Sequence, residues 1–303
     1  MSDLSVEIAG VTFENPIIAA SGTFGFGREY GEMFSLNELG GISVKGLTLT
    51  ERLGNKPPRI AETPSGILNS VGLQNPGVDV FLHDYLPELK KYSLKVIANI
   101  AGNTVGDYCE MAERISSSET DMIEMNISCP NVKEGGVAFG TSAKTVFEIV
   151  SAVKKHASKP LIVKLSPNVT DIAEIARSAE AAGADVLSLI NTLLGMKIDV
   201  KTRKPILNNN VGGLSGPAVR PVAVRMVWQV KNAVKIPVIG MGGIATAEDA
   251  LEFIIAGADA VSVGTAFFRN PFAAIDIKKG LCDYLDKNGI KSIKELTGSL
   301  ILN

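Results

Sequence analysis

Residues 236–266 read "IPVIGMGGIATAEDALEFIIAGADAVSVGTA", and this stretch decides the fold. A short apolar run ends in glycines, an amphipathic stretch follows at 246–256, and a second apolar run again ends in glycine. Near-continuous apolar runs are typical of parallel strands that are covered on both faces, and the stretch between them has helical periodicity. The stretch therefore predicts one strand–helix–strand unit of an α/β protein.

Runs of this kind occur eight times along the 303 residues. They are "NPIIAAS" (15–21), "GGISVKG" (40–46), "LKVIANI" (94–100), "DMIEMNIS" (121–128), "PLIVKLS" (160–166), "DVLSLINT" (185–192), "IPVIGMGG" (236–243) and "DAVSVGTA" (259–266). Helical stretches between them lie at 76–92, 142–157, 170–182 and 246–256. Eight such units predict a single (β/α)8 TIM barrel, one domain over residues 1–303. The rival, a doubly wound sheet with a second domain, would need a linker or a composition shift that the sequence lacks.

Three segments outside these units also carry information. The stretch "VEIAGVTFEN" (6–15) predicts an N-terminal β-hairpin with Gly10 near its turn, which would plug the barrel floor. The long connections 47–75 and 193–216 each follow a predicted strand, so they belong at the C-terminal face of the barrel. Because long loops at that face usually serve binding, we expect both of them to contribute to a site.

Composition favours work on a small molecule. With 30 Lys and Arg against 32 Asp and Glu, the net charge of -2 provides no field that would collect nucleic acid or an anionic membrane. No apolar run reaches the roughly 18 residues of a membrane helix, and no export signal opens the chain, so a cytoplasmic location is expected. The cysteines at 109, 129 and 282 form no C-x-x-C pair, which argues against a disulfide framework, a metal site or an iron–sulfur cluster.

The residues at the ends of the predicted strands form a largely polar set. They are Ser21, Lys45, Asn99, Asn126, Lys164, Asn191, Gly242 and Gly264. In a barrel the carboxyl ends of the strands surround the active site. Amides and two lysines there suit a planar ligand rich in carbonyl groups and tolerate negative charge.

Glycines after the last two strands predict a phosphate site. They let backbone N–H groups approach an anion closely, and Thr246 and Asp249 have the spacing of a capping box for the following helix. Gly216 would form a third side of this phosphate site. The stretch "GMGGIA" (240–245) also fits a dinucleotide fingerprint, but that motif requires an acidic residue where Gly264 stands, and too few strands follow it.

Few residues are candidates for proton transfer. A cysteine nucleophile would need a histidine beside it, but His83 falls inside a predicted helix and His156 falls in the last turn of another, toward the barrel floor. Glu124 lies two residues before Asn126 and deeper in the barrel, where a structural ion pair is expected. Cys129, three residues after the strand, is then the acid–base candidate at the mouth, with an inert buried thiol as the alternative. The hard step would fall to a phosphate-anchored cofactor.

Four motifs carry a resemblance to a known family. They are "NSVGLQNPG" (69–77), "NISCPNVKEGG" (126–136), "GGLSGPAVRP" (212–221) and "GMGGI" (240–244). In order and spacing they resemble the class 1 dihydroorotate dehydrogenases, and in particular the catalytic subunit of the NAD-linked 1B subtype, over nearly the whole chain. The resemblance implies an oxidoreductase that converts (S)-dihydroorotate to orotate in de novo pyrimidine biosynthesis, with FMN in the mouth of the barrel.

The same resemblance implies roles for individual residues. Cys129 would be the base that removes the C5 proton while a hydride passes from C6 to FMN, and Lys164 would stabilise negative charge on the reduced flavin. Implied FMN contacts are Ser21, Lys45, Gly46, Asn99, Asn126, Lys164, Ile190, Gly216, Gly242, Gly243, Gly264 and Thr265. Implied substrate contacts are Lys45, Asn69, Ser70, Val71, Gly72, Leu73, Asn126, Asn131, Asn191 and Thr192.

The sequence shows no group that could take electrons from the flavin, because it lacks the cysteines of an iron–sulfur cluster and a complete dinucleotide-binding fold. The 1B resemblance implies a separate subunit with FAD and a [2Fe-2S] cluster that passes electrons to NAD, in a heterotetramer around a homodimer of this chain. A 1A-type homodimer that uses fumarate, an FMN enzyme for another pyrimidine, and a flavin-free barrel that binds a phosphorylated metabolite are the alternatives.

Overall fold

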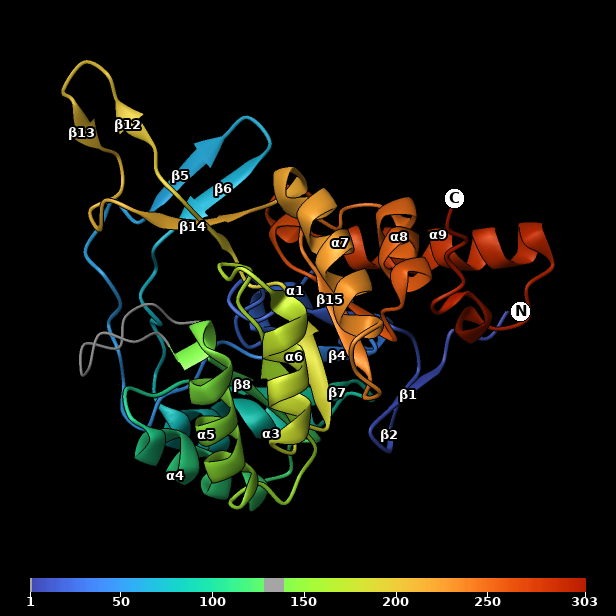
Figure 1. Ribbon diagram of the computed structural model, residues 1–303, viewed down its shortest axis with the longest axis horizontal. Helices are drawn as coiled ribbons and strands as arrows, with labels where there is room; N and C mark the ends of the chain where they lie inside the picture. The colour runs from blue at the N-terminus through green and yellow to red at the C-terminus, as the bar shows by residue number, and fades with distance from the viewer. Residues whose placement is uncertain (1, 128–138) are drawn as a thin grey trace.

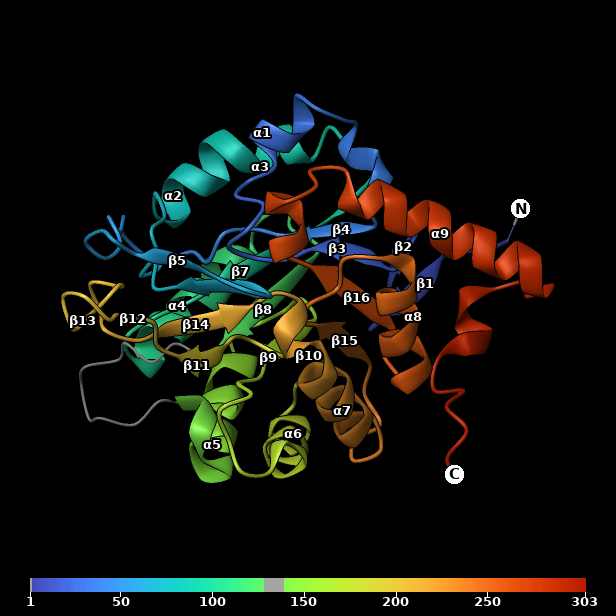
Figure 2. The ribbon, with the colours of Figure 1, turned by 90° about the horizontal axis from the view of Figure 1, so that it is seen from above.

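The computed structural model describes residues 2–127 and 139–303. Eight parallel strands close into a barrel in the order β10-β15-β16-β3-β4-β7-β8-β9 (Figures 1 and 2). Their bounds are β3 Ile17–Ala19, β4 Gly41–Ser43, β7 Lys95–Ile100, β8 Met122–Asn126, β9 Leu161–Lys164, β10 Val186–Leu189, β15 Val238–Met241 and β16 Ala260–Val263. Each predicted apolar run contains one of these strands, so the (β/α)8 prediction is confirmed.

Helices cover the outside of the barrel (Figure 2). They are α1 Arg28–Gly31, α2 Val78–Val80, α3 Leu86–Leu89, α4 Val105–Ser116, α5 Ala143–Lys154, α6 Ile172–Ala181, α7 Arg220–Lys231, α8 Ala247–Ala256 and α9 Ala273–Asn288. Further helical segments are η1 Leu36–Glu38, η2 Phe81–Tyr85, η3 Phe139–Thr141, η4 Pro217–Val219, η5 Thr265–Phe268 and η6 Ile293–Leu296. No helix in the described ranges has both the length and the apolar character that crossing a membrane requires.

One helix boundary differs from the prediction in a way that moves a histidine. The helix predicted over 142–157 ends at Lys154, so His156 lies just beyond α5 and not in its last turn. Its ring Nδ1 is 3.6 Å from Glu113 Oε2 on α4. His83 lies in η2, as predicted for the helical stretch there, and its side chain is 89% exposed. In these positions the two histidines remain outside the site described below.

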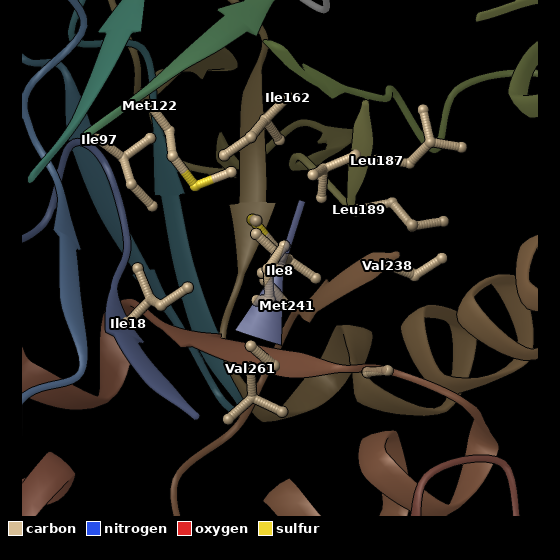
Figure 3. Close-up of a cluster of buried hydrophobic side chains, with 14 of the residues drawn as sticks. Ile8, Ile18, Ile97, Met122, Ile162, Leu187, Leu189, Val238, Met241 and Val261 are labelled. Atoms are coloured by element: carbon tan, nitrogen blue, oxygen red, sulfur yellow. The ribbon is translucent and has the colours of Figure 1, made fainter. Parts of the chain in front are cut away.

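The predicted N-terminal hairpin is present and contributes to the core. Strands β1 (Val6–Ile8) and β2 (Val11–Phe13) pair antiparallel, and Ala9 and Gly10 turn between them with φ of 48° and 80°. Ile8 is fully buried, and Figure 3 shows it among side chains from the barrel strands. Burial of each such aliphatic side chain stabilises the fold by about 1.5–3 kcal/mol. In both views the hairpin lies at the opposite end of the barrel from β5, β6 and β14 (Figures 1 and 2).

A repeated ion pair joins neighbouring units at the start of the strands. In each case an aspartate lies directly before a strand and accepts a hydrogen bond from a backbone N–H of the barrel strand that comes before it in the chain. The same aspartate pairs with a lysine at the end of the helix that leads into that earlier strand. The pairs are Lys90–Asp121, Lys154–Asp185 and Lys231–Asp259, with N···O distances of 3.2, 2.5 and 2.9 Å. The backbone donors are Val96, Leu161 and Val238. Each aspartate thus ties a helix end and two strands together.

The two long connections, predicted to be loops, form a second sheet. Its order is β11-β14-β6-β5, and all its pairings are antiparallel. The strands are β5 Ile60–Thr63, β6 Gly66–Asn69, β11 Leu193–Gly195 and β14 Gly212–Ser215, with a further pair of β12 Ile198–Asp199 and β13 Lys204–Pro205. Because β6 and β14 come from different connections, this sheet fixes one long loop against the other.

We expect Asp259→Ala to lower the free energy of unfolding by about 1–3 kcal/mol, because it leaves the buried Val238 N–H without its acceptor as well as removing the pair with Lys231. Urea unfolding followed by circular dichroism measures the change. Asp283→Ala, at an exposed position of α9, is the control and should stay within about 0.5 kcal/mol of the parent protein. Equal effects of the two substitutions would contradict the role of Asp259.

Candidate active site

A large cavity of about 1170 Å³ opens at the carboxyl ends of the barrel strands, and the second sheet contributes to its wall. Its volume exceeds the range of about 300–1,000 Å³ that is usual for a single small-molecule site. Among the described lining residues the charged ones are Lys45, Lys164, Arg269 and Glu62. An excess of cations in such a cavity favours an anionic ligand.

The structure brings the predicted site residues together. All the expected FMN contacts line this cavity, as do the expected substrate contacts Asn69, Ser70, Val71, Gly72, Leu73, Asn191 and Thr192. Cys129 and Asn131 lie outside the described residues. The cavity therefore collects side chains from both long connections and from the strand ends around the barrel, although they are distant in sequence.

Glu124, on β8, connects side chains from four other strands inside the barrel. Its Oε2 accepts hydrogen bonds from Ser43 Oγ on β4 (2.7 Å) and from Asn99 Nδ2 on β7, and its Oε1 accepts one from Ser188 Oγ on β10 (2.8 Å). Lys164 Nζ, on β9, lies 3.9 Å from Oε2. Since β4 and β10 are not neighbours of β8, these contacts cross the barrel interior. The predicted ion pair of Glu124 is present, and it is the centre of a wider network.

The environment of Glu124 keeps it ionised. Burial alone would raise the pKa of this carboxyl, but the Lys164 ammonium and the hydrogen bonds from Ser43, Ser188 and Asn99 outweigh burial, so its pKa lies below the usual range. The carboxylate accepts hydrogen bonds from the two serines and from Asn99 and forms an ion pair with Lys164, so it fixes Lys164 and Asn99, two residues that line the cavity. Their orientation therefore depends on the charge of Glu124.

Asn99 leaves one polar atom for a ligand. Its amide NH₂ donates to Glu124, which orients Oδ1 away from that carboxylate, and Oδ1 is buried with no hydrogen-bond partner among the described atoms. A Cβ on Gly46 would lie 3.0 Å from this oxygen, so the glycine keeps the approach to it open. Buried acceptors in proteins are normally satisfied. The site thus fits a ligand that presents an N–H group at this point.

The part of the cavity wall opposite Asn99, called the glycine wall below, consists of Gly242 and Gly243 after β15, Gly264 after β16 and Gly216 after β14. A Cβ on Gly243 would lie 2.7 Å from the carbonyl oxygen of Gly216, and a Cβ on Gly242 would lie 2.8 Å from the Ala223 methyl, so close packing requires both glycines. All three glycines have positive φ, at 78°, 101° and 131° for residues 243, 216 and 242. A Cβ on Gly264, in contrast, would meet nothing closer than 3.5 Å. Its backbone can therefore be approached closely by a ligand.

The helix that follows these glycines begins as predicted. Thr246 and Asp249 form a capping box at the start of α8, and Thr265 Oγ1 donates to Ser215 Oγ at 2.8 Å. In the barrel order, β15 and β16 lie across from β7 and β8, so this glycine wall faces Asn99 and Asn126 over the mouth.

Some residues of the site were not found from the sequence. Asn168 Nδ2 donates to the Thr192 carbonyl at 3.0 Å, and its Oδ1 accepts from the Leu194 N–H at 3.0 Å, which secures the start of β11 beside the cavity. Ser43 and Ser188 were missed as partners of Glu124. Tyr108, on α4, donates from its hydroxyl to the Asn126 carbonyl at 2.7 Å. A polar residue inside a predicted strand was the only available signal for the serines.

The fold and the site define the class of protein: a (β/α)8-barrel enzyme with its cavity at the carboxyl ends of the strands. Residues 3–285 match the family described as Dihydroorotate dehydrogenase. Proteins named "Dihydroorotate dehydrogenase B (NAD(+)), catalytic subunit" are 59% identical in Alkaliphilus metalliredigens and 58% identical in Alkaliphilus oremlandii, each over 98% of this chain and 99% of the relative. A solved structure of DHODH from Eimeria tenella, in complex with ferulenol, superposes with a TM-score of 0.79 at 26% identity, over 98% of this chain and 88% of that chain.

The chain belongs to the dihydroorotate dehydrogenase family, and it is an oxidoreductase. The predicted family and enzyme class are confirmed. The cytoplasmic location stays a prediction.

We expect Glu124→Gln to lower the free energy of unfolding by about 3 kcal/mol at pH 7, because an amide NH₂ would face hydrogen-bond donors and Lys164 would lose its counter-ion. The lowered pKa of Glu124 means that its ionisation stabilises the fold fully above the unfolded value of about 4.3, and that this stabilisation is lost as pH falls through the folded pKa. Urea unfolding at pH 7 and at successively lower pH should show a difference that narrows on acidification.

Exposed Glu119 provides the matched control, since Glu119→Gln should leave the free energy of unfolding near that of the parent protein at each pH. A Glu124→Gln protein as stable as its parent at neutral pH would show that the network around the carboxylate does not support the barrel.

Proposed function

We propose that this chain oxidises (S)-dihydroorotate to orotate in pyrimidine biosynthesis, with FMN bound in the cavity. The observation that carries the proposal is the pairing of a glycine wall after β15 and β16 with the Glu124 network on the opposite side of the mouth. The names of the relatives support dihydroorotate as the substrate. The cavity volume of about 1170 Å³ is consistent with a cofactor and a substrate held together.

The residues around the cavity fit FMN. The backbone at Gly216, Gly242, Gly243 and Gly264 would hold its phosphate. Asn99 Oδ1, which has no hydrogen-bond partner in the part of the chain that the structure describes, would accept a hydrogen bond from a ring N–H. Lys164, whose side chain is 7% exposed, would stabilise negative charge at the pyrimidine edge of the ring. FMN, when bound, supplies the acceptor for the hydride from C6 of the substrate.

Substrate would be held between the second sheet and the strand ends. Residues 69–73 follow or end β6, and Asn191 Nδ2 lies 3.4 Å from Asn126 Oδ1. Amide groups at these positions offer both donors and acceptors to a ring that also carries both. Lys45 would contact both ligands, and its charge suits the carboxylate of dihydroorotate.

Cys129 would act as the base. Its thiolate takes the C5 proton while the hydride leaves C6, and the two electron pairs of these bonds account for the C5–C6 double bond and the reduced acceptor. The sequence supports this role, because Cys129 follows the end of β8 by three residues and the described strand end carries Asn126. Asn131 would contribute to substrate binding from the same segment.

Electrons would leave through a partner. We propose a subunit with FAD and a [2Fe-2S] cluster that passes electrons to NAD, in a heterotetramer around a homodimer of this chain. The words "B (NAD(+)), catalytic subunit" in the names of the relatives support this route over direct use of fumarate.

Purified protein should be yellow, and anaerobic dihydroorotate should bleach the flavin band near stoichiometrically, because the cavity has groups for both molecules. Visible spectroscopy during an anaerobic titration measures this, and dihydrouracil is the comparison that tests for another pyrimidine. Addition of NAD should restore the colour only with the co-purified partner, whereas restoration by fumarate would indicate the alternative acceptor. A protein that cannot take up FMN would exclude the proposal.

Cys129→Ser should retain FMN but reduce it about 10²–10⁴-fold more slowly at neutral pH, because a serine hydroxyl is far less ionised than a thiol at that pH and provides much less of the basic form. Stopped-flow absorbance after anaerobic mixing with dihydroorotate gives the rate, and the deficit should shrink as pH rises. Cys282→Ser, on α9, removes a thiol away from the cavity lining and should leave the rate unchanged. Unchanged reduction in Cys129→Ser would assign that cysteine a structural role.

A further inference from the structure

Arg220 and Asp249 form an ion pair immediately behind the glycine wall. Arg220 begins α7, four residues after Gly216, and its Nη1 contacts Asp249 Oδ1 on α8. The side chain of Asp249 is 8% exposed and that of Arg220 is 30% exposed. Neither residue lines the cavity. The pair therefore lies close to the proposed phosphate site without contacting a ligand.

Asp249 connects this pair to the loop after β15. Its Oδ2 accepts hydrogen bonds from the Ala245 N–H at 2.9 Å and from the Thr246 N–H at 3.0 Å. Ala245 itself lines the cavity, two residues after Gly243. Asp249 therefore binds the loop after β15 through Oδ2 and Arg220 through Oδ1.

Arg220 is packed against the same loop through its stem. A Cβ on Gly243 would lie 2.9 Å from Arg220 Cβ and 2.7 Å from the Gly216 carbonyl oxygen. The loop at Gly216 (the 216 loop), the loop of residues 242–246 (the 242–246 loop) and Arg220 are therefore in close contact. The guanidinium is further neutralised by Glu252, whose Oε2 is 3.6 Å from Arg220 Nε. With two carboxylates beside it, Arg220 adds little net positive charge to the cavity, and its contribution is geometric.

We propose that the Arg220–Asp249 pair is a brace that sets the separation of the 216 loop and the 242–246 loop, and so positions the backbone N–H groups that bind phosphate. This inference rests on the proposed FMN site, because it assigns positioning residues to the phosphate end of that cofactor. Without the brace, only the packing of α7 against α8 sets the separation of the two loops, and they bind the phosphate less tightly. The ring end of the cavity, on the opposite side of the mouth, keeps its contacts.

The test compares FMN with riboflavin, which has the same ring but no phosphate. Full-length protein freed of flavin is titrated with each flavin, and quenching of flavin fluorescence gives the two dissociation constants. The parent protein should bind FMN more tightly than riboflavin. Arg220→Met and Asp249→Asn should weaken FMN binding about tenfold and leave riboflavin binding within about twofold, and Arg220→Lys should recover part of the loss.

Two features of the variants separate positioning from general damage. In Asp249→Asn the side-chain oxygen can still accept from Ala245 and Thr246 while the NH₂ group faces Arg220, so the variant tests the pair even where Arg220→Met fails to fold. Arg225→Met, at an exposed position of the same helix, is the matched control and should bind both flavins as the parent does.

Equal losses for FMN and riboflavin, or unchanged FMN binding in both variants, would overturn the brace while leaving the FMN site in place. A parent protein with no preference for FMN over riboflavin would overturn the proposed phosphate site and the brace together.

Discussion

A buried negative charge at Glu124 is the constraint on which the cavity depends. A carboxylate that is 3% exposed costs several kcal/mol to desolvate, so it is tolerated only where charged and polar partners surround it. Its partners come from β4, β7, β9 and β10, which means that five strands, with β8, must hold their mutual register for the charge to be satisfied. The same partners include Lys164 and Asn99, so the requirements of folding determine which groups face a ligand.

The Glu124 network serves both stability and the site, whereas the interactions at the start of the strands serve stability alone. At the start of the strands, the three lysine–aspartate pairs join each helix end to two strands, and they use groups that do not line the cavity. At the other end, polar side chains and glycines line open space. This division follows from the parallel arrangement, because every strand presents its carboxyl end to the same face, where loops can vary without disturbing the packing.

The sequence alone predicted the barrel because each strand carries its own signal, a buried apolar run that ends in a polar residue or glycine. The second sheet was missed because its signal is not local: Asn69 pairs with Gly213 across 144 residues, and the strands are only three or four residues long. The network of Glu124 was only partly predicted, since an ion pair can be inferred from depth within the strand, whereas the contribution of Ser43 and Ser188 depends on the register of non-adjacent strands. Cavity-lining residues at strand ends were therefore predictable, and the residues that orient them were not.

The two sides of the mouth differ in how they are fixed, and this difference bears on function. The glycine wall presents backbone groups whose positions are set by close packing of loops, with glycine required at 242 and 243. The opposite side presents side chains whose orientation is set by a charge. An anionic group such as a phosphate needs several donors at fixed positions but no change of charge during a reaction, so a rigid backbone suits it. A ring that gains negative charge needs a cation held against a compensating carboxylate, which is what Lys164 and Glu124 provide. The two sides of the mouth thus offer different environments, a closely packed glycine backbone on one side and a lysine paired with a buried carboxylate on the other.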